Sequence, residues 1–421
     1  MKGWSKKRLV EITEKIGSGA TPRGGQEAYK ESGISLFRSL NVYDGIFKKK
    51  NLAFIDEDQA SKLSNVVVRE GDVLLNITGA SVARCCVAPS EFLPARVNQH
   101  VAIIRPKLDY IDSNFLAYLL ASKQYKDALL NTGEKAGSTR QALTKVQLEN
   151  FEITIPRLPE QNRIVAILDE AFERIDRTIA NTKKNLTNSR ELFENYLSMI
   201  FTQKGDGWEE KKLGDVCENV EYGSSAKSQP KGEIPVLRMG NIQNGLIDWN
   251  DLAYTTDQEE ISKYLLKKND VLFNRTNSDV HVGKTAVYKG ERSAIFAGYL
   301  IRIHRKEELI DADFLNFYLN GSLAREYGKS VMSRSVNQAN INGTKLKEYP
   351  ISLPSVAVQK QIVEKFNFLL TETQRLEAIY CQKLAALNEL KQTILQRAFT
   401  GELTADTANQ ATKTAEGAIA A

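Results

Sequence analysis

The sequence contains few of the residues that bind metal ions or form disulfides. Its 421 residues include only four cysteines and three histidines. No two cysteines have the Cys-x-x-Cys spacing of a zinc or redox site, and the histidines are scattered along the chain. We therefore expect neither a structural metal ion nor a disulfide framework.

Long hydrophobic runs are also missing. No segment approaches the roughly 18–20 apolar residues of a membrane-spanning helix, and the basic N-terminus leads into polar sequence instead of the hydrophobic core of a signal peptide. The composition, with 42% hydrophobic and 26% charged residues, is that of an ordinary globular protein. These features predict a cytoplasmic protein that has no membrane segment.

Neither sign of charge dominates. The 57 basic and 52 acidic residues leave a net charge of +5, which by itself does not indicate nucleic-acid binding. The basic excess lies in residues 1–156. A run such as 48–50, three consecutive lysines, is most simply a solvated surface.

The motifs of several enzyme classes are absent or incomplete. The chain has no Pro-Pro pair, which excludes the Asn/Asp-Pro-Pro-aromatic tetrad of adenine methyltransferases. Residues 278–285 end in Gly-Lys-Thr like a phosphate-binding loop, but they begin with Ser278 where that motif needs glycine. The nuclease-like spacing of Asp206, Glu209 and Lys211 is common and is better interpreted as surface charge. We therefore expect no catalytic role for this chain alone.

What the sequence does contain is an internal repeat. The opening Trp4-x-x-Lys7-x-Leu9 returns as Trp208-x-x-Lys211-x-Leu213. Further blocks return in the same order: Arg38, Asn41 and Gly45 as Arg238, Asn241 and Gly245; Asp72–Leu74 as Asp270–Leu272; Pro156 and Gln161 as Pro354 and Gln359. The chain is thus one unit of about two hundred residues used twice.

Each copy changes character at a proline. Before Pro156 and Pro354, short β-rich runs alternate with one or two helical stretches, which is typical of a mixed α/β domain. After each proline, neither glycine nor proline occurs in residues 160–204 or 355–400. Each of these stretches therefore predicts one long helix.

Apolar residues recur along both predicted helices at alternating steps of three and four, the pattern of a coiled-coil seam. The seam is expected at Val165, Phe172, Ile179, Leu186, Phe193 and Ile200 of the first helix and at Phe366, Leu369, Leu376, Tyr380, Leu387 and Ile394 of the second. Two seams in one chain favour pairing with each other, in antiparallel fashion. The alternative is that each stripe packs on its own globular domain.

The expected fold class is therefore α+β, with two repeated mixed α/β domains joined by two long helices that form an antiparallel coiled coil. The expected segments are a first domain at 1–156, a central helix at 157–204, a second domain at 205–354, a C-terminal helix at 355–403 and a disordered tail at 404–421. Forty helical residues extend about 60 Å, which compares with the ~34 Å turn of B-DNA. Such helices could space two DNA-reading domains along a duplex.

In its repeated motifs the chain resembles a known family, the specificity subunits of type I restriction-modification enzymes. The resemblance covers essentially residues 1–403. It rests on the repeated Trp-x-x-Lys-x-Leu opening and on the segments Leu237–Ile242, Gly71–Leu74, Ile155–Ile164 and Leu390–Leu403. The second copy departs from the pattern in two places, at Asn269 in the position of Gly71 and at residues 355–358, which lack the second proline and the acid.

The resemblance implies a function. Such subunits have no catalytic activity of their own, carry two target-recognition domains, and read a bipartite DNA sequence with an unspecified gap. They seat two adenine-N6 methyltransferase subunits, and restriction-motor subunits join that core. The resemblance also implies that this chain binds no cofactor itself, and that S-adenosylmethionine, ATP and Mg are used by the partner subunits.

Loops that follow strands carry the candidate DNA-binding side chains. Arginine can pair with guanine and asparagine with adenine in the major groove, whereas hydroxyls and loop amides suit phosphates. The residues expected to contact DNA are Arg38, Asn41, Arg84, Ser138, Thr139, Arg140, Gln141, Arg238, Asn241, Asn274, Arg275, Asn277, Arg334, Ser335, Asn337 and Gln338. Equally, Arg38 and Arg238 could be strand-end residues tied to a carboxylate.

Two other functions remain open. The chain could be a coiled-coil scaffold whose two globular domains bind proteins, or, less favoured, a fused enzyme that cuts or methylates alone. If methyltransferase subunits do bind, the exposed faces of the two helices are the natural docking surface. Individual polar residues there, such as Arg163, Arg174, Arg177, Lys360 and Gln361, are more simply solvated.

Overall fold

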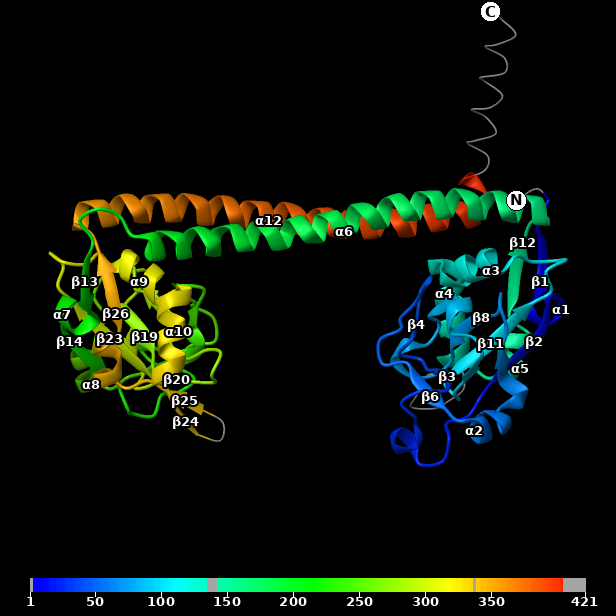
Figure 1. The fold of residues 1–421 in the computed structure, drawn as a ribbon, viewed down its shortest axis with the longest axis horizontal. Helices are drawn as coiled ribbons and strands as arrows, with labels where there is room; N and C mark the ends of the chain where they lie inside the picture. Colours follow the sequence, from blue (N-terminus) through cyan, green and yellow to red (C-terminus); the bar gives the residue numbers. More distant parts are fainter. Residues whose placement is uncertain (1–2, 135–141, 336–337, 404–421) are drawn as a thin grey trace, which may run out of the picture. The chain divides into compact units, whose positions relative to one another are not determined.

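The computed structural model describes residues 3–134, 142–335 and 338–403 (Figure 1). The chain divides into two compact units: unit 1 comprises Met1–Thr182 and Gln382–Ala421, and unit 2 comprises Lys183–Cys381. Each unit contains a stretch of both long helices, which the sequence analysis set apart as separate segments. The tail predicted at 404–421 lies outside the described residues.

Unit 1 is built on two four-stranded sheets. The first has the order β2 (Thr13–Ser18), β11 (Val101–Pro106), β8 (Val73–Asn76) and β9 (Cys85–Val87), and all its neighbours are antiparallel. The second has the order β6 (Ala53–Ile55), β3 (Ile34–Phe37), β10 (Ala95–Val97) and β7 (Val67–Val68), with β3 and β10 parallel. The remaining strands are β1 (Ser5–Arg8), paired with β12 (Glu152–Ile155), and β4 (Val42–Tyr43), paired with β5 (Ile46–Phe47).

Strand β8 is buried on both faces, because side chains alternate across a strand. Val73 and Leu75 pack into a core with the helices, whereas Leu74 packs into a second core between the two sheets. The shorter helices of unit 1 are α1 (Leu9–Ile12), α2 (Glu57–Ser61), α3 (Ser113–Ala121), α4 (Lys123–Glu134) and α5 (Lys145–Glu149).

Unit 2 repeats this frame. Its first sheet has the order β14 (Cys217–Tyr222), β23 (Leu300–Arg305), β19 (Val271–Asn274) and β21 (Thr285–Val287), and its second has β18 (Ala253–Thr255), β15 (Ile234–Leu237) and β22 (Ile295–Phe296). Strand β13 (Glu209–Lys212) pairs with β26 (Pro350–Leu353), and β16 (Ile242–Gln243) with β17 (Leu246–Ile247). The short helices are α7 (Leu213–Val216), α8 (Gln258–Tyr264), α9 (Ala312–Asn320), α10 (Ser322–Val331) and α11 (Gly343–Lys347).

Unit 2 also has a small third sheet. It has the order β20 (Thr276–Asn277), β25 (Gln338–Asn340) and β24 (Ser333–Ser335), all antiparallel. The corresponding stretch of unit 1 includes residues 135–141, which lie outside the described residues. This sheet carries candidate DNA-binding residues of the second copy.

The two long helices are α6 (Leu158–Gln203) and α12 (Val356–Phe399). In unit 2 they run antiparallel, since Arg190 pairs with Glu377 at 3.1 Å while Tyr196, further along α6, contacts Phe366, which is earlier in α12. In unit 1, Lys391 Nζ lies 2.7 Å from an Asp176 oxygen. The expected fold class, two repeated α/β domains with paired long helices, is confirmed.

Burial supports the predicted seam of α6 but corrects that of α12. Val165, Phe172 and Phe366 are buried, and the other predicted positions except Leu376 are half-buried: Ile179, Leu186, Phe193, Ile200, Leu369, Tyr380, Leu387 and Ile394. Leu376 is 38% exposed, and Glu377 is turned inward to pair with Arg190. The prediction at Leu376 was wrong, because the residue of α12 that contacts α6 at this level is its polar neighbour, Glu377.

A buried glutamine attaches each globular domain to its long helix. In unit 1, Gln161 Nε2 donates to the carbonyls of Tyr110 and Pro156, both at 2.9 Å, and its Oε1 accepts from Asp112 N at 2.9 Å. Gln359 makes the same three bonds in unit 2, with Leu309, Pro354 and Asp311. Both glutamines have no exposed surface. Each Asp also caps the helix that follows it, so one cluster of hydrogen bonds orders helix, loop and domain together.

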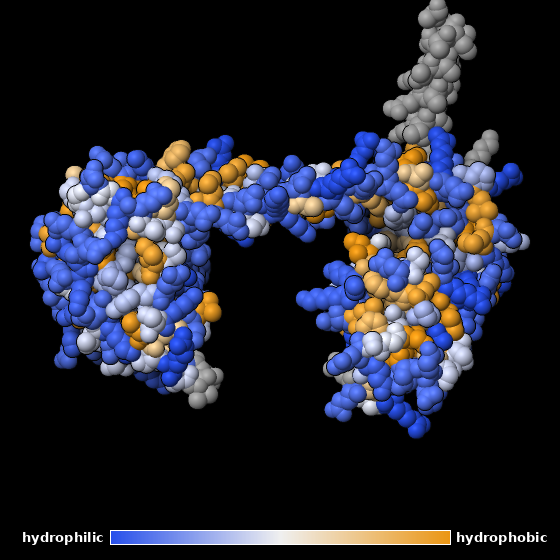
Figure 2. Space-filling view, in the orientation of Figure 1, coloured by the Kyte–Doolittle hydropathy of each residue, from blue (hydrophilic) through white to orange (hydrophobic). Residues whose placement is uncertain are grey.

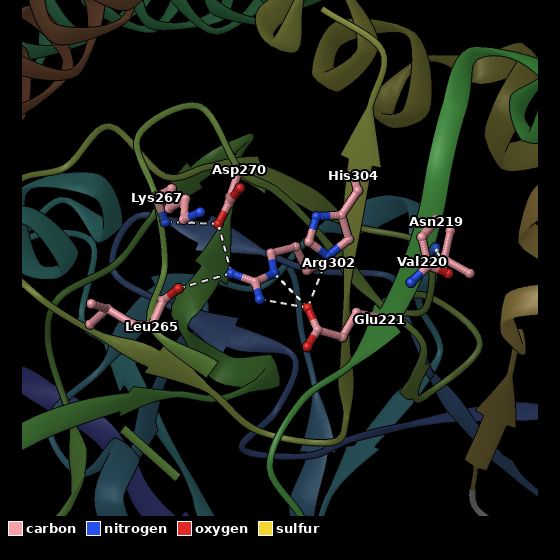
Figure 3. A network of polar contacts seen from close by, with 8 residues as sticks. All are labelled: Asn219, Val220, Glu221, Leu265, Lys267, Asp270, Arg302 and His304. Atoms are coloured by element: carbon pink, nitrogen blue, oxygen red, sulfur yellow. Dashed lines mark hydrogen bonds and ion pairs between the residues drawn. The ribbon is translucent and has the colours of Figure 1, made fainter. Parts of the chain in front are cut away.

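A network of charged side chains around the buried Arg302 lies on the first sheet of unit 2 (Figure 3). Arg302 is 6% exposed, and its guanidinium donates to Glu221 and Asp270 and to the carbonyl of Leu265 at 2.9 Å. His304 Nε2 lies 2.9 Å from the same Glu221 oxygen. Burial raises the pKa of Glu221, but the hydrogen bonds and charges of Arg302 and His304 lower it by more than burial raises it. The pKa of Glu221 therefore lies below its usual value.

In unit 1 the strand position of Arg302 is occupied by Ile103. Arg302 pairs with Leu272 across the sheet as Ile103 pairs with Leu74. The first copy instead pairs Arg105 with Asp72 at 2.7 Å. The two units thus place an ion-paired arginine at different positions of the corresponding strand.

None of the helices in the described ranges has a stretch apolar and long enough to span a lipid bilayer.

We expect Arg302→Met to destabilise unit 2 by about 1–3 kcal/mol at neutral pH, because the half-buried carboxylates of Glu221 and Asp270 lose the buried guanidinium that hydrogen-bonds to both. Hydrogen–deuterium exchange of β19 and β23 should show this loss. The difference should shrink below about pH 4.5, the ordinary pKa of glutamate. There the wild type loses the stabilisation that a lowered pKa provides, and protonation relieves the variant.

Lys289→Met is the matched control, since Lys289 forms a more exposed pair with Asp313 and its loss should cost less than about 1 kcal/mol. Equal protection of β19 and β23 in Arg302→Met and the wild type at pH 7 would contradict the assigned role.

Candidate nucleic-acid interface

The recurring Arg-x-x-Asn segment holds a loop together in both units. Asn41 is fully buried, accepts from Arg38 N at 3.1 Å and donates to the Lys48 carbonyl at 2.8 Å. Arg38 reaches the carbonyl of Asn51. The same atoms in unit 2 make the same bonds: Asn241 accepts from Arg238 N and donates to Asp248 and Asn250, and Arg238 reaches the carbonyl and carboxylate of Asp251.

The prediction that Asn41 and Asn241 read bases was therefore wrong. Their amides are used by the backbone of the hairpin β4–β5 or β16–β17 and its return loop. Asn51 and Asp251, where that loop ends, have left-handed φ angles of 59° and 47°, and such a conformation needs external support. Arg38 and Arg238 are also committed to this loop, and only Arg238 has the carboxylate contact that the alternative interpretation expected.

Asn274 and Arg275 are also structural. Asn274 has no exposed surface and lies at the end of β19, as Asn76 does at the end of β8. Arg275 donates to the carbonyl of Gly298 at 3.1 Å and packs over the Tyr222 ring at 4.8 Å. Asn274 cannot contact DNA from this position, and Arg275 has limited freedom to do so.

A basic residue stands at the same place in both units, immediately before β9 and β21. Asn76 N donates to the Arg84 carbonyl and Asn274 N to the Lys284 carbonyl, both at 2.8 Å, which establishes the correspondence. The Arg84 guanidinium lies 4.9 Å from the Tyr43 ring centre. In unit 2, Lys284 Nζ donates to Gln243 Oε1 at 3.2 Å. Each basic side chain is thus held against the hairpin next to it.

Unit 1 is the more basic at this hairpin. Lys48 Nζ lies 3.6 Å from the centre of the same Tyr43 ring, and Lys49 and Lys50 follow it on the exposed surface. The corresponding residues in unit 2 are Asp248, Trp249 and Asn250. Sequence reasoning missed Tyr43, Lys48 and Lys284, and dismissed the lysine run as ordinary surface. The only available signal was that Arg84 and Lys284 occupy the same place in the repeat.

In unit 2 the hairpin borders a hollow of about 420 Å³. Arg238, Asn277, His281 and Lys284 are among the residues that line it. Burial, and then the charge of Arg325, lower the pKa of Lys284. Positive charges that repel one another in this way would be stabilised by a phosphate group. Asn277 remains a candidate contact.

The small third sheet presents the other candidates. Arg334, Ser335 and Gln338 are all exposed on β24 and β25. Arg334 Nε is 3.0 Å from an Asp279 oxygen, and Ser335 Oγ donates to the Gln338 carbonyl at 3.2 Å. These three stay predictions. The other expected contacts, Ser138, Thr139, Arg140, Gln141 and Asn337, lie outside the described residues.

The segment that resembles a phosphate-binding loop has another architecture. Lys284 and Thr285 lead into strand β21, whereas the motif requires a helix at this point. Thr285 is fully buried, and its Oγ1 donates to Asn316 Oδ1 at 2.7 Å. No group of three or more His, Cys, Asp or Glu side chains in residues 3–134, 142–335 and 338–403 could hold a metal ion.

The chain is similar in sequence to proteins of one known family. The sequence model described as the type I restriction modification DNA specificity domain matches residues 1–188 and again residues 205–384. The chain is 32% identical over 212 residues to the putative type I restriction enzyme MjaX specificity subunit of Methanocaldococcus jannaschii, a match that spans about half (49%) of each chain. It is 23% identical over 398 residues to the EcoKI specificity subunit of Escherichia coli K12, covering 89% of this chain and 84% of that one.

A solved structure shares the fold. One chain, from work on the complex assembly and conformational transition of the type I R-M system, superimposes with a TM-score of 0.74. The match covers 96% of this chain and 99% of the other at 20% sequence identity.

Asn241→Ala and Lys284→Ala should separate the structural residues from the contacts. We expect Asn241→Ala to loosen hairpin β16–β17 at a cost of about 1–3 kcal/mol and to leave the preferred DNA sequence unchanged. Lys284→Ala should keep the fold and weaken DNA binding, with the salt dependence reduced by about one counterion. Urea unfolding and salt-dependent fluorescence anisotropy measure both. A changed base preference in Asn241→Ala would show that this asparagine does read DNA.

Proposed function

The chain belongs to the type I restriction-modification DNA specificity family, and on that premise we propose that it is the DNA-recognition subunit of such a complex. Each unit would read one half of a bipartite target. The chain would not cut or methylate by itself but would direct partner subunits to the sequence. These partners, not this chain, would use S-adenosylmethionine, ATP and Mg.

One observation carries this proposal. The same specificity domain matches both copies of a repeat whose supporting hydrogen bonds recur while the exposed residues at the hairpin differ. Residues 48–50 of unit 1, three lysines, occupy the same positions after the hairpin as Asp248, Trp249 and Asn250 of unit 2. A constant frame with different surface residues is suited to reading two unlike half-sites. A scaffold with two protein-binding domains would not need this basic hairpin.

Assembly with methyltransferase subunits is the second element of the proposal. The surface of the chain is mostly hydrophilic, but hydrophobic patches occur on the long helices (Figure 2). In unit 2, Leu192 and Phe368 are 62% and 66% exposed and border a groove of about 680 Å³. Tyr196 and Leu369 also line this groove. Large exposed apolar side chains of this kind are typical of a protein-binding surface, and a methyltransferase subunit would cover them.

Two of the polar residues considered earlier, Arg174 and Arg177, fit less well as docking anchors. Arg174 and Arg177 pair with Glu170 and Glu173 on their own helix, one turn away, and are more than 70% exposed. Such pairs contribute little binding energy. Gln361 is the exception, since it lines the groove beside Phe368.

Exchange of one domain tests the proposal. Strand β1 pairs with β12, so the two ends of residues 1–156 lie side by side and the segment can be exchanged as a block. We expect a chain whose residues 1–156 come from another specificity subunit to recognise a target changed in one half only, because unit 2 is untouched. Sequencing that maps methylated adenines in cells with the partner subunits gives both half-sites.

The matched control exchanges residues 205–354 instead and should change only the other half. A target altered in both halves by either exchange would contradict one domain per half-site. The absence of any sequence preference in the parent complex would favour the scaffold.

A further inference from the structure

Unit 2 contains a cavity beside α10. Its volume is about 270 Å³. It lies between α10, the loop 279–283, strand β24 and Tyr349. Its inner wall is apolar and includes Leu319, Met332 and Ile341. Its size is just below that of a typical small-ligand pocket, which holds roughly 300–1,000 Å³.

The cavity is there because unit 2 has small residues where unit 1 has large ones. Helices α4 and α10 occupy the same place in the two copies, following helices α3 and α9 that start from the equivalent caps Asp112 and Asp311. In this register Ala324 stands where unit 1 has Tyr125, and Gly328 where it has Leu129. Tyr125 and Leu129 are buried in the core of unit 1, at 7% and 0% exposure. The same space is filled with side chains in one unit and open in the other.

The side chain of Tyr349 lines this space. Tyr349 is 2% exposed, and no hydrogen bond joins its hydroxyl to another residue of the described chain. A Cβ atom on Gly328 would lie 2.6 Å from that hydroxyl, so glycine is required for the hydroxyl to occupy its position. Unit 1 has Phe151 at the equivalent place, packed edge-on against Tyr125. Unit 2 therefore has both a cavity and a polar group in its wall at a place where unit 1 is packed with apolar side chains.

The phenol keeps its proton at neutral pH. Burial, together with the neighbouring Tyr327 and Tyr318, raises the pKa of Tyr349 well above the ordinary value. A neutral phenol both donates and accepts a hydrogen bond. A ligand atom in the cavity could therefore pair with it either as donor or as acceptor.

The mouth of the cavity is cationic. Arg325, Lys329 and Arg334 line it and all three are exposed. Asp279 is the only carboxylate among the lining residues, and Arg334 Nε lies 3.0 Å from it. Arg325 Nε donates to the Asn320 carbonyl at 2.9 Å, which leaves the rest of its guanidinium for another acceptor. An anionic group is the complement of this rim.

We propose that this cavity binds one nucleotide unit, with the base against the apolar wall and Tyr349, and the phosphate at Arg325, Lys329 and Arg334. A base supplies the flat apolar faces and the ring acceptors that the wall and the phenol match, and the phosphate matches the rim. The nucleotide comes either from bound DNA, as a base turned out of the duplex, or from free mononucleotide. The first source rests on the proposed function, because β24 also carries the candidate DNA contact Arg334.

Titration of the full chain with each of the four deoxynucleoside monophosphates, followed by isothermal calorimetry, tests the cavity itself. We expect one saturable site for at least one of them and much weaker binding of the matching nucleoside and of inorganic phosphate. Tyr349→Phe should weaken binding roughly tenfold, the effect of losing about 1.4 kcal/mol. Lys329→Gln should weaken the monophosphate and leave the nucleoside unaffected.

A filled-cavity variant provides the decisive control. Ala324→Tyr, Gly328→Leu and Tyr349→Phe together install the three residues that pack in unit 1, so the fold has a precedent for them. This variant should lose mononucleotide binding. No binding by the wild type, or undiminished binding by the filled variant, would overturn the proposal.

Duplexes with 2-aminopurine at successive positions of the unit 2 half-site distinguish the two sources. With the chain alone, a rise in fluorescence that the filled variant abolishes assigns the pocket to a base of bound DNA. No rise, with mononucleotide binding intact, assigns it to the free nucleotide. Failure of the proposed function is recognised separately, as absence of sequence preference in a wild-type chain that still binds mononucleotide.

Discussion

The architecture depends on one buried side chain at the first turn of each long helix. Gln161 and Gln359 each bond to two backbone carbonyls and one backbone N–H that belong to the domain before the helix. A buried amide with all of these groups satisfied is costly to displace, because each partner would be left without water or a substitute. The helix therefore leaves its domain in a fixed direction within each unit. Any function that uses the helices to position the domains requires this attachment.

Around this attachment, the two units share their secondary structure but differ in the side chains that it carries. The four-stranded sheet, the hairpin with its buried asparagine, and the basic residue before β9 or β21 recur in both copies. Other positions have diverged: Ile103 of unit 1 corresponds to Arg302 of unit 2, Lys48 to Asp248, and Tyr125 to Ala324. The divergent positions lie on the first sheet, at the hairpin and beside α10. Duplication followed by such changes gives a chain two related but unequal surfaces, with a cavity beside α10 in unit 2 at a place where Tyr125 and Leu129 pack in unit 1.

The sequence predicted the repeat, the long helices and the seam of α6, because each has a strong local signal. The absence of glycine and proline and a sustained apolar period identify a helix without any knowledge of its partner. The seam of α12 could not be predicted correctly at Leu376. Whether Leu376 or Glu377 contacts α6 depends on Arg190 of the partner helix, which the sequence of α12 alone does not show. The recurring Arg38 and Asn41 pattern was misread as a DNA contact. A polar motif that repeats can equally be a support for the backbone, and burial, which distinguishes the two, depends on contacts far away in the sequence.

The central claim is that paired helices set the gap between two independently read half-sites. The helices cross from one unit to the other after Thr182 and Cys381. Inserting one heptad at each of these points keeps the pairing pattern and lengthens both helices by about 10 Å. Mapping of methylated adenines in cells with the partner subunits should then show both half-sites unchanged and a longer unspecified gap between them. An altered half-site with an unchanged gap would contradict the account.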